Sequence, residues 1–287
     1  MNSIEKVVEL LRKNSAEISR TVNVENTKFT NEIIPKTILD NKQKVKIDFD
    51  GLQDKGFITP DTIGGEKSEE YRVIKRPILR NAFGKGAVSI PNGNMIMISS
   101  SLPGEGKTYT SLSLAMSISL ELDTTVLLVD CDLINPSLSR LLEVDENIGL
   151  TDYLVDPAIA LEDVILNTSI PQLRLIPSGA RHEQSNELLT STKMTDLIKE
   201  LSERYTDRVV LFDTPPLLLA NQARVMSQLM GQIIVVVEAE VTPQNIVKEA
   251  IDLLDHDKAI GIILNKTRKL SGGNYYGAYH YNSSSKE

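Results

Sequence analysis

The sequence predicts an α/β fold in which a mainly parallel β-sheet is flanked by helices. From residue 94 onward, short apolar runs alternate with helical segments, which is typical of βαβ units. Each run is too short for a core helix and is read as a buried strand: 95–99, 125–129, 173–177, 209–212, 233–237 and 260–264. The covering helices are expected at 107–122, 186–205, 222–230 and 243–254. Because ligands of such sheets bind beyond the carboxyl ends of the strands, functional residues are expected directly after the runs.

The composition is that of an ordinary globular protein and excludes several classes. The chain has 287 residues, 41% of them hydrophobic, with 31 Lys+Arg against 39 Asp+Glu and a net charge of −8. A single cysteine, Cys131, cannot form an internal disulfide and agrees with a reducing cytosol. The acidic balance argues against broad nucleic-acid binding, so no nucleic-acid partner is expected. No charge-free stretch reaches the roughly 18 residues of a membrane span, and the first residues lack the core of a secretion signal, so a cytoplasmic location is expected.

The N-terminal part of the chain is expected to precede the main domain. Residues 1–20 predict an amphipathic helix, because Ile4, Val7, Val8 and Leu11 recur at helical spacing. Its apolar stripe either packs on the domain itself or contacts a partner or a membrane. Residues 21–67 are polar and irregular, with strand-like alternation only at 44–49, and predict a linker.

The main domain is expected to span residues 68–270. It would begin with a helix at 68–80, for which Ser68 is the expected N-cap and Pro77 the residue that kinks or ends the helix. The remaining residues, 271–287, are expected to form a flexible tail.

A phosphate-binding loop follows the first predicted strand. The segment 101–108 reads Ser-Leu-Pro-Gly-Glu-Gly-Lys-Thr, which fits the loop pattern except that Ser101 stands at the first glycine. Gly104 and Gly106 let backbone N–H groups approach phosphate oxygens, and Lys107 supplies positive charge at the start of a helix. Thr108 is an expected magnesium ligand. The nucleotide contacts are therefore expected at Pro103, Gly104, Glu105, Gly106, Lys107, Thr108 and Tyr109.

Carboxylates follow two further strands at the same edge. Asp130 and Asp132 come directly after the second run, and Asp213 ends the fourth. Carboxylates there can hold Mg²⁺ and its water shell, or orient a hydroxyl and accept its proton. The alternative is that they only cap a helix and start turns. Asn265, after the last run, is in the place where such folds often contact a base, although a turn explains it nearly as well.

The C-terminal tail gathers half of the tyrosines. Four of eight, Tyr275, Tyr276, Tyr279 and Tyr281, lie among Gly, Asn and Ser in the last 13 residues. This composition cannot build a core, so the tail is expected to be disordered and exposed. Phenolic hydroxyls on a flexible tether can reach a nucleotide γ-phosphate, and phosphate acceptance is the favoured interpretation over a merely adhesive tail.

Taken together, these residues resemble the bacterial tyrosine kinases, P-loop NTPases that autophosphorylate a C-terminal tyrosine cluster. The likeness rests on the loop 103–108, the Asp130-x-Asp132 turn, the strand end at Asp213 and the tyrosine tail. A fifth feature, the trio Glu69, Arg72 and Lys75, is similar to the family's oligomerisation motif, with Lys in place of the last Arg. The segment 68–84, the three leucines at 217–219 and the N-terminal helix look like the subgroup associated with exosortase and exopolysaccharide gene clusters.

The chain departs from this family at two positions. Ile134 stands where the family places an arginine, and Ser101 replaces the first loop glycine. The ParA and MinD positioning ATPases share the fold, but Leu102 stands where they carry a signature lysine. This substitution weighs against a positioning ATPase, and the alternative function is a ParA/MinD-like or other non-kinase regulatory ATPase that acts as a nucleotide-dependent binding switch.

The resemblance implies a tyrosine kinase that uses ATP and Mg²⁺. Lys107 would hold phosphates, and Thr108, Asp130 and Asp213 would serve the metal. Asp130 would also orient or deprotonate the phenol, and Asp132 would support the metal. Glu69, Arg72 and Lys75 would pair subunits in a homo-oligomeric ring. The implied partner is a membrane protein of the polysaccharide co-polymerase or chain-length type, which would recruit the kinase to the inner face of the plasma membrane to regulate exopolysaccharide polymerisation and export.

Overall fold

A computed structural model describes residues 44–268, apart from 87–88, 205–206 and 256. The predicted N-terminal helix, residues 21–43 of the predicted linker and the tyrosine tail lie outside the described residues. All six predicted strands are confirmed within one residue at each end: β1 (Met95–Ser100), β2 (Thr125–Asp130), β4 (Leu173–Ile176), β5 (Arg208–Asp213), β6 (Gln232–Glu238) and β7 (Ala259–Asn265). The short apolar runs succeed as predictors because these strands are buried on both faces, except at the β7 edge.

The strands form one seven-stranded sheet in the order β3-β4-β2-β5-β1-β6-β7. Every pair is parallel except β3 (Leu166–Asn167) with β4, which is antiparallel. The sequence did not predict β3, since two residues carry no periodicity. The mainly parallel sheet is therefore confirmed, with one short antiparallel strand at its edge.

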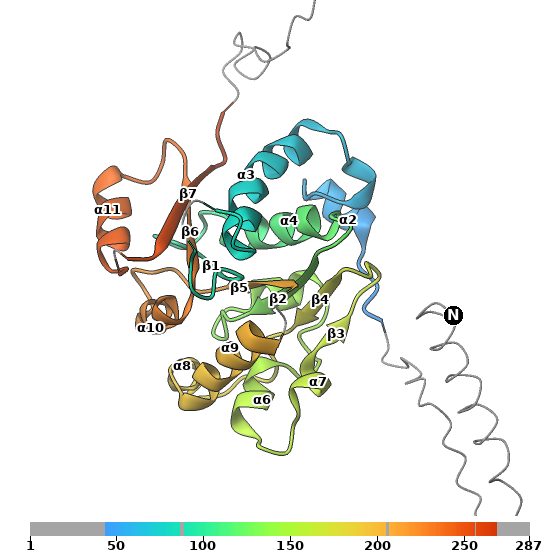
Figure 1. The fold of residues 1–287 in the computed structure, drawn as a ribbon, viewed down its shortest axis with the longest axis vertical. Helices are drawn as coiled ribbons and strands as arrows, with labels where there is room; N and C mark the ends of the chain where they lie inside the picture. Colours follow the sequence, from blue (N-terminus) through green and yellow to red (C-terminus); the bar gives the residue numbers. More distant parts are fainter. Residues whose placement is uncertain (1–43, 87–88, 205–206, 256, 269–287) are drawn as a thin grey trace, which may run out of the picture. The chain divides into compact units, whose positions relative to one another are not determined.

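Helices cover both faces of the sheet (Figure 1). On one face lie α2 (Phe49–Asp54), α3 (Glu66–Ala82), α4 (Lys107–Ser119) and the short α5 (Ser137–Leu141). On the other lie α6 (Leu150–Val155), α7 (Leu161–Val164), α8 (Ser185–Leu189), α9 (Thr192–Arg204), α10 (Asn221–Leu229) and α11 (Gln244–Asp252). No helix in the described part of the chain is long and apolar enough to cross a bilayer.

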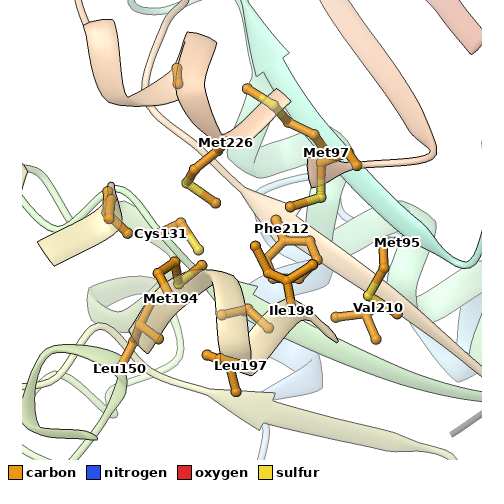
Figure 2. Packing of buried hydrophobic residues seen from close by; sticks show 14 of the residues in the cluster. Met95, Met97, Cys131, Leu150, Met194, Leu197, Ile198, Val210, Phe212 and Met226 are labelled. Carbon is orange, nitrogen blue, oxygen red and sulfur yellow. The ribbon is translucent and has the colours of Figure 1, made fainter. Parts of the chain in front are cut away.

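The core on the α9 and α10 face is rich in sulfur. Figure 2 shows Phe212 of β5 with Met97, Met194 and Met226 around it, and all four side chains are fully buried. Methionine adapts to irregular gaps and makes favourable contacts with aromatic rings. This packing fixes β5, whose last residue, Asp213, lies at the edge of the sheet where the site is predicted.

The start of the main domain differs from the prediction. Residues 44–67 were expected to be linker, yet Ile47, Leu52 and Ile58 are buried in the core. The strand-like stretch at 44–49 forms only an isolated bridge, Val45 with Thr168, before α2 begins. Single apolar residues, spaced along an irregular and mostly polar segment, thus anchor it to the core. The polar composition alone does not indicate this burial.

Helix α3 also differs from its predicted bounds. It begins after Gly65 rather than at Ser68 and continues five residues past Pro77. A proline removes one helical hydrogen bond, but Tyr71, Lys75 and Ile78 are buried on one side of α3. Tertiary packing therefore outweighs the local break.

The long helix predicted at 186–205 is two helices, α8 and α9. They are separated at Thr190 and Ser191, and Ser191 Oγ accepts a hydrogen bond from the N–H of Met194 at 3.2 Å. A serine in this position caps a new helix, which explains the interruption.

Candidate active site

The predicted functional residues meet at the carboxyl edge of the sheet. Asp130 ends β2 and Asp213 ends β5, and the two residues are directly opposite each other in the parallel register. Strand β1, on the other side of β5, leads into the loop 101–106. The topology therefore brings together three segments that lie far apart in the sequence.

The loop has the backbone that its glycines predict. Gly104 and Gly106 have φ angles of 84° and 99°, which L side chains rarely adopt. A Cβ at Gly104 would meet no heavy atom within 4 Å, so the space beside this glycine is open. Ser101 Oγ is fully buried and has no hydrogen-bond partner among the described residues. Lys107 then opens α4, whose N–H groups point toward the loop.

Lys107 forms a buried ion pair with Asp132. Lys107 Nζ lies 2.8 Å from Asp132 Oδ2, and the two side chains are only 10% and 7% exposed. Burial by itself would lower the pKa of Lys107, but the charges of Asp213 and Asp132 outweigh burial and raise it. Lys107 is therefore held in the charged form that phosphate binding requires.

Thr108 is bound to the neighbouring strand end. Its Oγ1 donates to Asp213 Oδ2 at 2.7 Å, and Ser111 Oγ donates to Asp213 Oδ1 at 3.0 Å. Burial raises the pKa of Asp213, whereas Lys107 and these two hydroxyls act in the opposite direction. The predicted metal residues Thr108 and Asp213 are thus brought into direct contact.

Asp130 is held in a different set of contacts. Its Oδ2 accepts from both the N–H and the Oγ of Ser139, at 2.8 and 2.7 Å, and its Oδ1 accepts from the N–H of Asp132 at 3.2 Å. Ser139 Oγ in turn accepts from the N–H of Ser178 at 2.9 Å. Burial and the charge of Asp213 raise the pKa of Asp130 to about 7. Asp130 therefore connects β2 to α5 and the segment after β4, and its roles toward metal and phenol remain predictions.

The Glu105 side chain anchors the phosphate loop to neighbouring segments. It is 2% exposed; its Oε2 accepts from the N–H of Leu102 at 2.6 Å, and its Oε1 accepts from Thr242 Oγ1. Asn265 Nδ2 donates to the Glu105 carbonyl at 2.9 Å, and Lys266 Nζ donates to the Gly104 carbonyl at 2.8 Å. The loop is thus fixed to the segment that follows β6 and to the end of β7 with the residue after it.

The structure places other predicted residues away from this contact network. Tyr109 donates its hydroxyl to the Gly56 carbonyl at 2.7 Å, and its ring lies 4.8 Å from that of Phe57. Tyr109 therefore contacts the α2 segment, and its predicted nucleotide contact stays a prediction. Ile134, where the resembling family places arginine, is 59% exposed.

The three residues of the predicted oligomerisation trio have unequal surroundings. Glu69 and Arg72 are exposed and pair with each other at 2.9 Å. Lys75 is 5% exposed; its Nζ donates to the Ser117 carbonyl at 2.6 Å and pairs with Glu121 at 2.7 Å. Within this chain Lys75 therefore joins α3 to α4.

The residues present fit a magnesium–nucleotide complex. Magnesium prefers oxygen ligands, keeps several waters, and usually binds with substrate phosphates rather than in an all-protein cage. The Thr108 hydroxyl and the Asp213 carboxylate supply such oxygens beside the open loop. In the described part of the chain no three His, Cys, Asp or Glu side chains cluster as a metal site. Because Mg²⁺ usually binds with substrate phosphates, these two oxygens fit an ion that would bind together with the nucleotide.

Sequence reasoning missed three polar residues of this network: Ser111, Ser139 and Thr242. Ser111 lies four residues after Lys107, so helical spacing could have placed it on the same face of α4. Ser139 and Thr242 lie in segments whose approach to Asp130 and Glu105 depends on tertiary packing. No local signal marks either one.

These features define a P-loop NTPase domain. A glycine-containing loop leads from the parallel sheet into α4, and Lys107 and Thr108 at the start of α4 each contact a carboxylate. The family model described as an AAA domain matches residues 93–257. Tyrosine-protein kinase CpsD of Streptococcus agalactiae is 32% identical over 178 residues, which cover 61% of this chain and 75% of that protein. The chain therefore belongs to the bacterial tyrosine kinases, a group of P-loop proteins within the AAA domain family.

Further comparisons agree with this membership. Tyrosine-protein kinase ptk of Acinetobacter johnsonii is 33% identical over 189 residues, which cover 65% of this chain but only 25% of that protein. The kinase domain of Escherichia coli tyrosine kinase ETK superposes with a TM-score of 0.59 at 26% identity, over 72% of this chain and 80% of that one. The septum site-determining protein MinD of Pyrococcus horikoshii, complexed with Mg-ADP, superposes with a TM-score of 0.50 at 31% identity, over 59% of this chain and 68% of that one.

Proposed function

We propose that this protein is an ATP-dependent protein-tyrosine autokinase that phosphorylates its own C-terminal cluster: Tyr275, Tyr276, Tyr279 and Tyr281. The observation that carries the proposal is the pairing of two adjacent P-loop residues with carboxylates at two strand ends, Lys107 with Asp132 and Thr108 with Asp213. Membership of the bacterial tyrosine kinases and the concentration of tyrosines in the tail support the choice of acceptor.

The chain's own residues would act mainly by positioning and by charge neutralisation. The loop amides and Lys107 bind the β- and γ-phosphates, with Lys107 already charged before the nucleotide arrives. Thr108 and Asp213 would hold Mg²⁺, and Asp132 would support its water shell. When bound, Mg²⁺ neutralises charge that develops on the phosphate oxygens.

The transfer forms one bond and breaks one. The phenolic oxygen of a tail tyrosine bonds to the γ-phosphorus, the bond from that phosphorus to the β–γ bridging oxygen breaks, and ADP leaves. The phenol has an ordinary pKa of about 10 and must give up its proton during the step. Asp130, whose pKa is raised to about 7, is the proposed acceptor or orienting group.

We further propose that the kinase works as a homo-oligomer at the membrane. Glu69 and Arg72 are exposed on α3 and available to a neighbouring subunit, whereas Lys75 would act by holding α3 in place. The sequence resemblance supports a membrane polysaccharide co-polymerase as partner, recruitment to the cytoplasmic face of the plasma membrane, and control of exopolysaccharide polymerisation and export. Charge accumulating on a phosphorylated tail would then dissociate the ring by repulsion.

The test is the intact mass of the purified full chain after incubation with MgATP. The wild type is expected to gain steps of about 80 Da, one for each phosphate. Lys107→Met and a variant with the four tail tyrosines changed to Phe should gain none. The tyrosine variant leaves the nucleotide site intact, so its ATP binding serves as the control for folding.

Two other results would change the proposed function or the proposed acceptor. ATP turnover without any mass change, also with the cytoplasmic segment of a candidate membrane partner present, would identify a regulatory ATPase instead. Steps that persist in the variant without tail tyrosines would move the acceptor into the domain. Tyr71 is a poor candidate there because it is buried.

A further inference from the structure

A basic groove lies at the opposite end of α4 from the phosphate loop. It has a volume of about 760 Å³ and is lined by α3, by the segment that follows it and by residues 121–124. Thr124 directly precedes β2, so the groove is at the amino edge of the sheet, whereas Lys107 is at the carboxyl edge. The groove is thus separate from the candidate active site.

The charge of the groove is opposite to that of the protein. Its lining has five cationic side chains and two acidic ones, which gives +3 on a chain of net charge −8: Arg72, Lys75, Arg76, Arg80 and Lys85 against Glu121 and Asp123. Lys75 neutralises Glu121 at 2.7 Å. Arg76, Arg80 and Lys85 are exposed and form no ion pair with any described residue.

The groove also has an apolar wall. Leu79 and Phe83 of the α3 end line it, together with Leu122, which is 92% exposed. Arginines at helical spacing beside an apolar surface match the two parts of a phosphotyrosine, a dianionic phosphate and an aromatic ring. Arg76 and Arg80 are four residues apart on α3 and so lie on one face of the helix.

We propose that this groove binds the phosphorylated form of the protein's own tail, residues 270–287, through its phosphotyrosines. The tail has no Asp, Glu, Lys or Arg from 270 to 285, so it is neutral until it is phosphorylated. Each phosphate adds about −1.5 to −2 charges, which makes capture conditional on modification. The occupant follows from charge complementarity, and the proposal rests on the tail being the kinase's substrate.

The tail is long enough to reach the groove from the active-site edge. The thirteen residues from 269 to Tyr281 can extend to about 43–47 Å, whereas the 13 residues of α4 extend for only about 20 Å. Capture at the far end of α4 would remove the product from the transfer site. Because Arg72 also lines the groove, a bound tail would compete with the subunit contacts proposed for that helix.

The test measures peptide binding to the dephosphorylated full chain without ATP. A fluorescent peptide of residues 270–287 with four phosphotyrosines is titrated by anisotropy, beside the unphosphorylated peptide. The phosphopeptide should bind, and its Kd should rise at least about tenfold in Arg76→Glu/Arg80→Glu. The matched control is Arg224→Glu/Lys248→Glu, which reverses two exposed charges on α10 and α11 and should leave the Kd unchanged.

Further arms identify what is recognised. Leu122→Ser and Lys85→Ala should each weaken binding several-fold, and a phosphoserine version of the peptide should bind less tightly because it lacks the rings. Equal affinity for the double-arginine variant and the wild type would overturn the proposal, as would equal binding of inorganic phosphate and phosphopeptide. Because the peptide is synthetic, the result does not depend on autophosphorylation, and the intact-mass experiment can fail independently.

Discussion

Thr108 Oγ1 lies 2.7 Å from Asp213 Oδ2, although 105 residues separate the two in the sequence. The hydroxyl belongs to the start of α4 and the carboxylate to the end of β5, so the contact fixes the P-loop helix to the sheet. Ser111, one turn further along α4, binds the other oxygen of the same carboxylate. The side chain expected to meet the metal is therefore positioned before any ligand arrives.

Removing this hydroxyl should impair transfer far more than shortening the side chain. Thr108→Val keeps the shape but loses the hydroxyl, and the rate of tail phosphorylation is expected to fall at least about 100-fold, as is typical for loss of a transition-state contact. Thr108→Ser keeps the hydroxyl and should retain activity within about fivefold. The rates are read from intact mass against time at saturating MgATP. Equal rates for the Val and Ser variants would contradict the role of the hydroxyl.

The buried pair of Lys107 and Asp132 predicts strong coupling between two substitutions. Lys107→Met leaves the buried Asp132 carboxylate without its partner and should reduce the free energy of unfolding by about 3–5 kcal/mol, whereas Asp132→Asn leaves the Lys107 ammonium with the charge of Asp213 and should reduce it by less. The double variant should lose clearly less than the sum, because neither charge then remains. Urea unfolding of the nucleotide-free proteins at pH 7 provides the four values of the cycle. Additive losses would mean that the two groups do not stabilise each other.

The sequence predicts the strands and the carboxylate positions because both depend on local patterns. Asp130 and Asp213 end apolar runs of parallel strands, and parallel strands bring such ends to one edge. Contacts made by Ser139 and Thr242 could not be predicted, since they depend on how loops pack. The burial of Lys75 could be predicted in part, because its helical spacing from Tyr71 and Ile78 places it on the same side of α3 as these two apolar residues.

The Glu105 carboxylate should be required for tight ATP binding because it anchors the phosphate loop. Glu105→Ala removes the acceptor for the Leu102 N–H and for Thr242 Oγ1, so the loop loses its anchor to the segment after β6. We expect ATP to bind at least about tenfold more weakly, with a loss of about 1–3 kcal/mol in the free energy of unfolding. Thr242→Val removes one contact of this carboxylate and leaves those with the N–H groups of Leu102 and Glu238, so it should have a smaller effect on both quantities. Calorimetric titration with MgATP and urea unfolding measure the two effects, and unchanged affinity in Glu105→Ala would exclude this anchoring role.

The raised pKa of Asp130 predicts a pH dependence of stability with a defined sign. Asp130 has a pKa of about 7 in the folded protein against 3.8 ordinarily, so between these values the folded state holds a proton that the unfolded state releases. The free energy of unfolding contributed by this group therefore falls as the pH rises from about 4 to 7, by at most a few kcal/mol. Asp130→Asn should flatten this slope in urea unfolding with EDTA, whereas Asp145→Asn, at an exposed position, should not. A variant slope identical to that of the wild type would show that Asp130 does not titrate in this range.

Substitutions at Lys75 and Arg72 should distinguish an effect on folding stability from an effect on subunit assembly. Lys75→Met removes a buried hydrogen bond to the Ser117 carbonyl and an ion pair with the exposed Glu121, so it should reduce the free energy of unfolding by about 1–3 kcal/mol. Arg72→Gln removes only an exposed pair with Glu69 and should change stability by less than about 1 kcal/mol. If α3 forms the subunit contact, Arg72→Gln should instead shift the mass measured by light scattering toward the monomer. An oligomer that persists in Arg72→Gln and in Glu69→Gln at equal concentration would place the subunit interface elsewhere on the chain, because both exposed members of the trio would then be dispensable.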